Sequence, residues 1–396
     1  MLTKRGEVLF GRHKLVDGMF VMIGVGASIL IFLLSTSSHI FGIDFAALYA
    51  AAFFTASGQP ELVYHLAEHH AFMEELYWQT VPLIPYFYGP YTLLLFWPLS
   101  YLPYWWSLGV WQGLQMGFYL VLVYKSFRRP RIVVLALCFP AVFLNVYWGQ
   151  NALFSTALLL GCIYFIDRNE ILAGICLGLL CYKPQLAIMC IVAVVANRKY
   201  RCLAMVVVVS GVAALSSFLL WGAPVWIAYL DAISKFADIS LLDGWKLTAA
   251  VQPTLYSALR LAGVSMIEAQ CLQYLCSVLL AGLVFWVWRQ RSSNDALSVA
   301  ILGFATMLGL SYYIQYDMLL TMVPLLYYQK AVSFPGRADY LLCGMLWVLP
   351  VLSWLLVGLS SMQIAPVVFL MALLRCLERW RRQERESAFR NIVSNR

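Results

Sequence analysis

The amino-acid sequence predicts an all-α, polytopic membrane protein with about twelve transmembrane helices. Of its 396 residues, 62% are hydrophobic and only 12% are charged, whereas roughly a quarter of an ordinary soluble domain is charged. Apolar stretches of spanning length recur from Val16–Ser37 to Leu341–Val357. Lys and Arg residues cluster between these stretches, and the clusters order the crossings because basic residues mark cytoplasmic ends.

The first apolar stretch follows the basic segment Met1–Lys14 and has no small-residue cleavage site. We therefore expect an uncleaved first helix rather than a signal peptide. No Lys or Arg occurs from Leu15 to Tyr124, so the segment after the first helix is predicted to lie outside. Residues 1–378 are expected to form one transmembrane domain, followed by a basic cytoplasmic tail at 379–396.

The later basic clusters alternate with segments that are predicted to lie outside. The clusters are at 125–131, 198–201, 289–291, 330–337 and in the tail. The outer segments are Gly149–Asn151, Lys183–Gln185, Gly222–Gln252, Ser311–Asp317 and Ser360–Gln363. Tyr88–Tyr124 is interrupted by prolines and fits either one crossing with a re-entrant piece or several crossings.

The largest outer segment, residues 38–88, is predicted to carry two helices on the membrane surface. Apolar residues recur at helical spacing between Phe45 and Ala56, which is typical of an interfacial helix. Gly58 ends that helix, and Pro60 suits the first turn of a second helix from Glu61 to about Gln79. Asp44 lies at the start of the first helix, where it is either an N-cap or a general base at the mouth of a cavity.

Composition argues against several other kinds of site. The ten cysteines show neither zinc spacing nor a disulfide framework. His65 and His69 have the spacing of a metal pair, but no third ligand is evident, so no metal or other cofactor is expected. The net charge of +8 comes from basic residues at helix ends, which indicates membrane topology rather than nucleic-acid binding.

Several short motifs, in their order and spacing, resemble the glycosyltransferase family 87-like proteins, which are C-type (GT-C) membrane glycosyltransferases. The similarity extends over most of Met1–Leu326. The motifs are Gly42-Ile-Asp-Phe-Ala-Ala-Leu-Tyr-Ala-Ala-Ala, Gly58-Gln-Pro, Val63-Tyr64, Phe87-Tyr-Gly-Pro90 with Pro98 and Pro103, Gly149-Gln-Asn151, Ala173-Gly174…Gly178…Tyr182-Lys-Pro-Gln185 and Tyr313…Tyr316-Asp317.

The resemblance implies a hexosyltransferase that moves mannose from a polyprenyl-phosphate donor to a glycolipid or glycan acceptor. It places the reaction at the outer, periplasmic face of a bacterial inner membrane, and it makes Asp44 the catalytic base. This chain departs from the pattern in two ways. Gly89 replaces a proline of the family's Tyr-Pro-Pro segment, and Tyr313, Gln315, Tyr316 and Asp317 stand where the mycobacterial mannosyltransferases carry a histidine motif.

The residues themselves support such chemistry. Lys183 is the only Lys or Arg in Ile171–Ala196, and it either holds the donor phosphate or extends to the interface as an anchor. Pro184 should break the helix beside it. Asp317 binds sugar hydroxyls or pairs with Lys183. Gln150 and Asn151 are amide partners for sugar hydroxyls or plain caps, and Tyr88 and Tyr316 complete the substrate-binding set. One base suffices for an inverting transfer.

Two other functions compete with this reading. A multi-pass transporter should show inverted repeats with matching broken helices, and the sequence shows neither. A lipid-linked polysaccharide ligase or polymerase tends to have a late outer loop with Arg and His, whereas here the large loop is early and contains no Arg.

Overall fold

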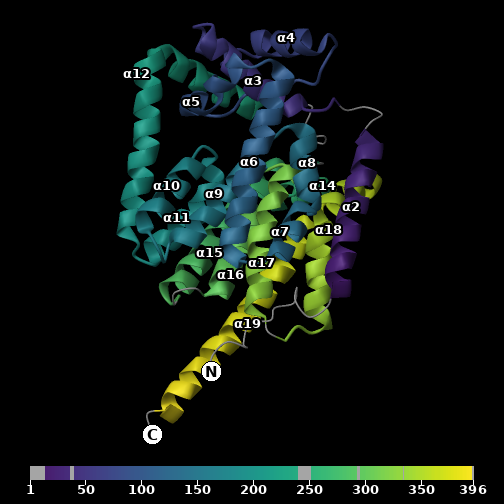
Figure 1. Ribbon diagram of the computed structural model, residues 1–396, viewed down its shortest axis with the longest axis vertical. Coiled ribbons are helices and arrows are strands. Elements are labelled where there is room, and N and C mark those ends of the chain that lie inside the picture. Colours follow the sequence, from purple (N-terminus) through teal and green to yellow (C-terminus); the bar gives the residue numbers. More distant parts are fainter. Residues whose placement is uncertain (1–13, 36–39, 240–250, 292–294, 333, 395–396) are drawn as a thin grey trace.

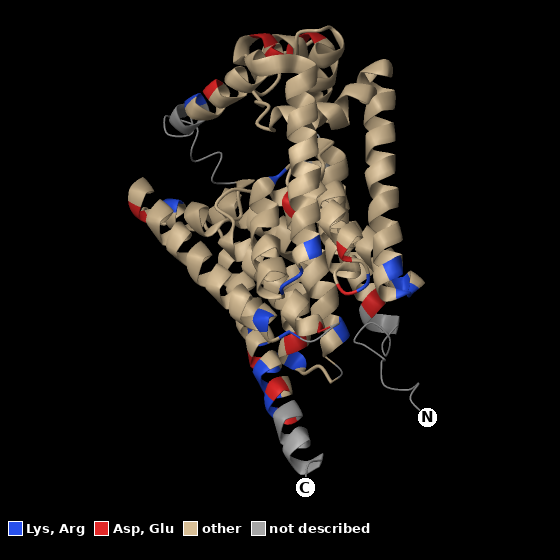
Figure 2. Cartoon of the chain, turned by 90° about the vertical axis from the view of Figure 1, so that its left-hand side faces the viewer, with Lys and Arg blue, Asp and Glu red and all other residues tan. Residues whose placement is uncertain are grey.

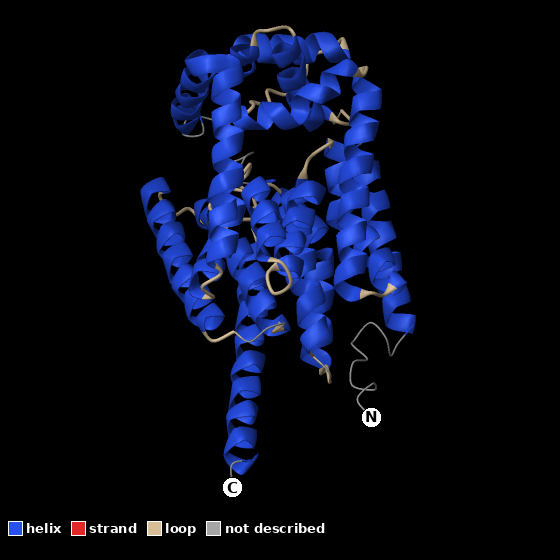
Figure 3. Cartoon of the chain, turned by 60° about the vertical axis from the view of Figure 1, so that its left-hand side comes forward, coloured by secondary structure: helices blue, strands red, loops and turns tan. Residues whose placement is uncertain are grey.

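The computed structural model describes residues 14–35, 40–239, 251–291, 295–332 and 334–394. Within these ranges the chain forms α-helices and short 3-10 helices with no strand, so the predicted all-α class is confirmed. Figure 3 shows this helical content throughout.

The elements up to Ala196 are α2 (Lys14–Ser35), α3 (Ile43–Ala56), η1 (Pro60–Tyr64), α4 (Leu66–Tyr77), η2 (Pro90–Thr92), α5 (Leu93–Phe96), η3 (Trp97–Tyr101), α6 (Tyr104–Phe127), α7 (Pro130–Leu137), α8 (Pro140–Trp148), α9 (Ala152–Phe165), α10 (Glu170–Leu180) and α11 (Pro184–Ala196). Those after it are α12 (Tyr200–Ile239), α14 (Leu255–Leu261), α15 (Met266–Arg289), α16 (Ala296–Gly309), η4 (Gln315–Thr321), α17 (Met322–Ala331), α18 (Arg337–Ser360) and α19 (Ala365–Ser394).

The elements between Ile43 and Tyr101 form a unit that we call the cap. Figure 1 shows the cap at one end of the molecule, above a bundle made by the remaining helices. Each part has its own apolar core. One cluster of buried side chains fills the cap, and a second cluster fills the bundle. Tyr88, Trp148 and Phe154 pack against both clusters and therefore mark the junction between the two parts.

Helix α12 connects the bundle to the cap. Its first part packs along α10, and its last part packs against η1, η2 and α5 of the cap, where Val225 is fully buried in the cap core. The two parts are separated by a break at Gly222, whose backbone is non-helical, and Pro224 follows two residues later. The break lets one continuous segment follow the bundle and then turn onto the cap (Figure 1).

The predicted count of about twelve crossings is not confirmed. Among the described residues, three helices are long and apolar enough to span a membrane, and the bent pair α7–α8 makes a fourth if it is one span. Many other apolar helices have only 10 to 17 residues, so most of them are shorter than the hydrocarbon core of a bilayer, which is roughly 30 Å thick. The hydropathy of the sequence located the apolar stretches, but it did not show where helices within a stretch are interrupted.

One local prediction needs correction. The second helix of the outer loop does not run unbroken from Glu61 to Gln79, because His65 has an extended backbone between η1 and α4. The ambiguous segment Tyr88–Tyr124 consists of the short helices η2, α5 and η3 followed by the single long helix α6. Helix α19 continues through position 378/379, and the division of the chain there stays a prediction.

The basic clusters gather at the end of the bundle away from the cap, as Figure 2 shows for most Lys and Arg residues. Contacts between distant segments agree with this grouping. Arg131 forms an ion pair of 2.6 Å with Asp17 near the start of α2, and Arg375 and Arg379 of α19 both pair with Asp339 of α18. The side of the membrane that this end faces stays a prediction.

The cap is joined to the bundle through two turns that pack directly on each other. Gly42 precedes α3 and Gly149 follows α8, and both have left-handed backbones with φ of 75° and 76°. The amide of Gly42 donates to the carbonyl of Tyr147 at 2.9 Å. A Cβ on Gly149 would lie 2.6 Å from the Cβ of Phe45 and 3.3 Å from the Cα of Gly42. Only glycine fits both the conformation and the space.

Gly149→Ala should therefore destabilise the protein by about 1–3 kcal/mol, because the new methyl group overpacks the contact with Phe45. The thermal midpoint of the purified protein in detergent measures this. Gly113→Ala is the matched control, since a Cβ at Gly113 of α6 meets nothing within 4 Å and alanine favours a helix. An equal midpoint in the two variants would contradict the close contact.

Candidate active site

Asp44 lies in the first turn of α3, at the junction of cap and bundle, and it is half-buried. Its Oδ2 accepts a hydrogen bond of 2.9 Å from the Gln150 side chain. The N-cap of α3 is Gly42, and no side chain caps that helix. The predicted capping role of Asp44 is therefore wrong. Its carboxylate reaches across to the bundle instead of serving its own helix.

The turn that carries Gln150 is fixed by amide side chains. Gln112 and Gln115 of α6 both donate to the backbone carbonyl of Gln150, at 3.1 and 2.7 Å. Asn145 donates to Gln112 at 3.0 Å and accepts from the amide of Ala152 at 2.6 Å, so it caps the start of α9. The backbone of Gln150 is thus held by two side chains of α6, and its side-chain amide donates to Asp44.

Asn151 connects this turn to two tyrosines. Its Nδ2 donates to the Tyr88 hydroxyl at 2.9 Å, and its carbonyl accepts from the Tyr182 hydroxyl at 3.1 Å. The rings of Tyr88 and Tyr182 stack with centroids 5.9 Å apart. The Oδ1 of Asn151 is buried without a hydrogen-bond partner among the described residues, so it is available to accept a hydroxyl from a ligand.

Lys183 and Asp317 form a buried ion pair. The Lys183 Nζ donates to Asp317 Oδ1 at 2.8 Å, with side-chain exposures of 6% and 7%. As predicted, the chain breaks here, since α10 ends at Leu180 and α11 begins at Pro184. Tyr316 places its ring centroid 5.6 Å from the Lys183 ammonium. Of the two alternatives for Asp317, sugar binding or pairing with Lys183, the structure shows the ion pair.

These groups act electrostatically on one another. Burial raises the pKa of the Asp44 carboxyl to about 6, the hydrogen bond from Gln150 and the charge of Lys183 lower it in part, and the charge of Asp317 raises it again. All seven residues singled out in the sequence therefore lie in one connected region: Asp44, Tyr88, Gln150, Asn151, Lys183, Tyr316 and Asp317. The Asp44 carboxylate and the Lys183 ammonium thus belong to one polar junction.

A cavity of about 340 Å³ lies in the cap next to this region. Tyr64, Tyr86 and Phe87 line it on one side, and Asp231 of α12 and Glu68 of α4 are among its polar residues. The Tyr86 and Tyr88 rings contact each other, with centroids 5.3 Å apart. The cavity and the Asp44 region are therefore connected through the ring contact between Tyr86, which lines the cavity, and Tyr88.

The predicted histidine pair does not act as a unit. His69 is buried, and its Nε2 lies 3.0 Å from the carbonyl of Ile84, so this nitrogen carries the proton and donates. Burial lowers the pKa of His69 to about 4. His65 is exposed. No group of three or more His, Cys, Asp or Glu side chains among the described residues is arranged to hold a metal ion.

Sequence reasoning missed the glutamines that support the site. Gln112 and Gln115 are spaced at i, i+3 on the otherwise apolar α6, and polar residues within apolar helices are functional candidates by default. Gln315 was noted only as a departure from a motif. Its Nε2 is buried with no partner in the described part of the chain.

Comparison with known proteins adds one finding. The family model described as glycosyltransferase family 87 matches residues 86–312, which is more than half of the chain. The match includes Tyr88, Gln150, Asn151 and Lys183 but not Asp44 or Asp317, and it is narrower than the resemblance predicted over Met1–Leu326. No curated protein and no solved structure matches.

Breaking the Lys183–Asp317 pair from one side should destabilise the protein strongly. Asp317→Asn leaves a buried ammonium without its counter-charge, which typically costs 3–5 kcal/mol. Lys183→Met combined with Asp317→Leu removes both charges and should recover most of that loss. The thermal midpoints of the single and double variants measure the difference. A double variant no more stable than Asp317→Asn would show that the pair is not the stabilising unit.

Proposed function

We propose that this chain, which belongs to glycosyltransferase family 87, transfers mannose from a polyprenyl-phosphate donor to a glycan or glycolipid acceptor. Family membership makes the chain a membrane glycosyltransferase. The observation that supports the finer proposal is the convergence of Asp44, Gln150 and Lys183 at the junction of cap and bundle.

Asp44 is our candidate for the general base. Transfer requires a group that takes the proton from the acceptor hydroxyl as its oxygen bonds to the anomeric carbon. Such a base works best when its pKa lies near the operating pH, and burial raises the pKa of Asp44 to about 6. The hydrogen bond from Gln150 stabilises the ionised form and fixes the orientation of the carboxylate.

Lys183 is our candidate for the group that receives the leaving phosphate. When the bond between the anomeric carbon and the phosphate oxygen breaks, negative charge grows on the polyprenyl phosphate, and an ammonium stabilises it as a point charge. Asp317 accepts a hydrogen bond from one of the three N–H groups of the Lys183 ammonium. Asp317 would thus position the ammonium while two donors remain for the phosphate.

The sugar would lie between these two groups. Asn151 offers its unpartnered side-chain oxygen, Oδ1, and Tyr88 and Tyr316 offer aromatic rings at the same junction. A single base and a separate phosphate site favour direct displacement with inversion at the anomeric carbon, because no second carboxylate is needed as a nucleophile.

The neighbouring cavity in the cap suits the acceptor. Its aromatic wall and its carboxylates are the groups that bind the apolar faces and the hydroxyls of sugars, and a volume of about 340 Å³ lies within the usual range for small-ligand sites. We place the cap on the outer, periplasmic face of a bacterial inner membrane, because the basic residues cluster at the opposite end.

Asp44→Asn tests the base directly. The amide oxygen of asparagine still accepts the Gln150 hydrogen bond, so the variant should fold and bind donor normally, but turnover should fall by about 100- to 10,000-fold. Transfer from polyprenyl-phosphate-mannose by protein in nanodiscs measures this. Glu75→Gln, which neutralises an exposed carboxylate of the cap, is the control and should keep full activity.

The pH profile of the native protein supplies a second readout. The base must be ionised, so activity should be half-maximal near pH 6, level off above about pH 7 and fall about tenfold per unit below about pH 5. Near-normal turnover in Asp44→Asn would place the base elsewhere. Activity with nucleotide-linked mannose alone would refute the polyprenyl-phosphate donor while leaving the role of Asp44 intact.

Cysteine labelling tests the orientation. In whole cells, an impermeant thiol reagent should modify Glu68→Cys in the cap and should not modify Arg128→Cys at the basic end, with both made in a variant whose exposed Cys271 is replaced. The reverse pattern would contradict a periplasmic site, because Glu68 belongs to the cap and Arg128 follows α6 at its far end.

A further inference from the structure

A small polar pocket lies at the opposite end of α9 from Asn151. Ser126, Arg168, Arg291, Tyr327 and Lys330 are among its lining residues, and they come from four separate segments of the bundle. Because α9 has 14 residues, this pocket is about 20 Å from the candidate active site. It is a separate feature that the proposed catalysis does not use.

The pocket carries a surplus of positive charge. Arg291 forms two hydrogen bonds with Asp167, at 3.2 and 2.9 Å, and Lys199 lies 3.8 Å from Asp167 and 3.5 Å from Glu170. These two cations are thus matched by two carboxylates. In the described part of the chain, no carboxylate lies within ion-pair distance of the other two cations, Arg168 and Lys330.

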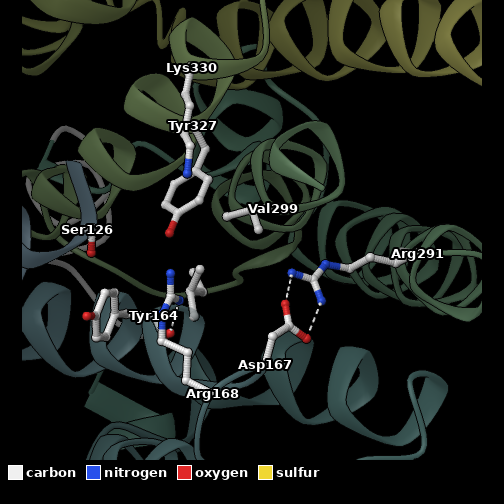
Figure 4. A pocket seen from close by; sticks show the side chains of 9 residues that line it. Ser126, Tyr164, Asp167, Arg168, Arg291, Val299, Tyr327 and Lys330 are labelled. Carbon is white, nitrogen blue, oxygen red and sulfur yellow. Dashed lines mark hydrogen bonds and ion pairs between the residues drawn. The ribbon is translucent and has the colours of Figure 1, made fainter. Parts of the chain in front are cut away.

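Aromatic rings hold the two unmatched cations without neutralising them. The Arg168 guanidinium lies 4.2 Å from the centroid of the Tyr164 ring, and the Lys330 ammonium lies 5.4 Å from that of Tyr327. Figure 4 shows the Tyr327 hydroxyl pointing toward the Arg168 guanidinium, with Ser126 on the adjacent wall. Two fixed cations and two hydroxyl groups therefore converge on one small space.

One buried donor in this space lacks an acceptor. The Nε of Arg291 has no hydrogen-bond partner among the described residues, and the buried Oγ of Ser126 interacts only weakly, with the Tyr327 hydroxyl. Buried polar groups are nearly always paired. A site with surplus cations and an unpartnered N–H donor matches an oxyanion, which accepts several hydrogen bonds and supplies the missing charge.

We propose that this pocket binds the phosphate group of an anionic membrane phospholipid. The volume of the pocket is about 10 Å³, which is the space of one water-sized group. One phosphate oxygen fills it, and the remaining oxygens meet the exposed side chains of Arg168 and Lys330 at its mouth. A lipid is favoured over a free ion because the pocket opens at the basic end of membrane helices, where headgroups lie.

Such a lipid would tie together the helices that carry the active site. Ser126 lies in α6, which also provides Gln112 and Gln115, and Arg168 follows α9, which begins next to Asn151. Tyr327 and Lys330 belong to α17, which continues directly from η4 with Tyr316 and Asp317. The inference concerns binding at the far ends of these helices and does not depend on the proposed reaction.

The test uses the full chain in nanodiscs of phosphatidylcholine, with and without phosphatidylglycerol, at fixed salt. Native mass spectrometry measures retained phosphatidylglycerol, and the thermal midpoint reports its stabilising effect. The pocket variant is Arg168→Gln with Lys330→Gln. The control variant, Arg201→Gln with Arg381→Gln, removes the same charge from two exposed arginines.

The pocket variant should bind phosphatidylglycerol about ten- to thirtyfold more weakly and lose the rise in midpoint, while the control variant keeps both. Equal losses in the two variants would reduce the effect to general surface charge and overturn the proposal. In phosphatidylcholine alone, added inorganic phosphate should not raise the midpoint. If inorganic phosphate raises the thermal midpoint as much as phosphatidylglycerol does, the pocket binds soluble phosphate instead.

Discussion

The contact between the turns at Gly42 and Gly149 is the constraint on which the arrangement of the site depends. Each turn begins or ends a helix. A side chain on Gly149 would meet Phe45 and the backbone of Gly42, and a side chain on Gly42 would meet Leu108 and Tyr104 of α6. Asp44 is two residues beyond one turn and Gln150 is one residue beyond the other. When the backbones meet, the carboxylate and the amide are already opposite each other. The site is thus positioned by main-chain packing, and its side chains need little further adjustment.

A layer of polar side chains follows from the same junction. Two apolar cores meet here, and polar groups between them must find partners within the protein because water is scarce. Most do, through the amides around Gln150 and through the Lys183–Asp317 pair. The few that do not, such as Asn151 Oδ1 and Gln315 Nε2, identify where a substrate would complete the network.

The sequence predicted features that depend on a single residue or its chain neighbours. It did not predict features that depend on contacts between distant segments. Lys183 stood out as a lone cation in an apolar segment, and Pro184 predicted the break beside it; both features are local. The interpretation of Asp44 as a cap failed because its partner, Gln150, is 106 residues away. The glutamines of α6 were missed for a similar reason, since their role depends on the carbonyl of Gln150. The count of crossings was not confirmed because apolar helices such as α9, α10 and α11 have only 14, 11 and 13 residues, fewer than a spanning helix needs.

The break in α12 has a consequence for how the protein meets its surroundings. The apolar part of this helix is only 11% buried, so lipid chains contact most of its surface, whereas its last part is anchored in the cap core through Val225. A bilayer that is thicker or thinner than the helix changes its tilt. The tilt would act on the bundle through the packing of the first part of α12 on α10, and on the cap through the bent last part beyond Gly222. Membrane thickness would then affect the junction between cap and bundle, and it is set by the composition of the bilayer and not by the protein.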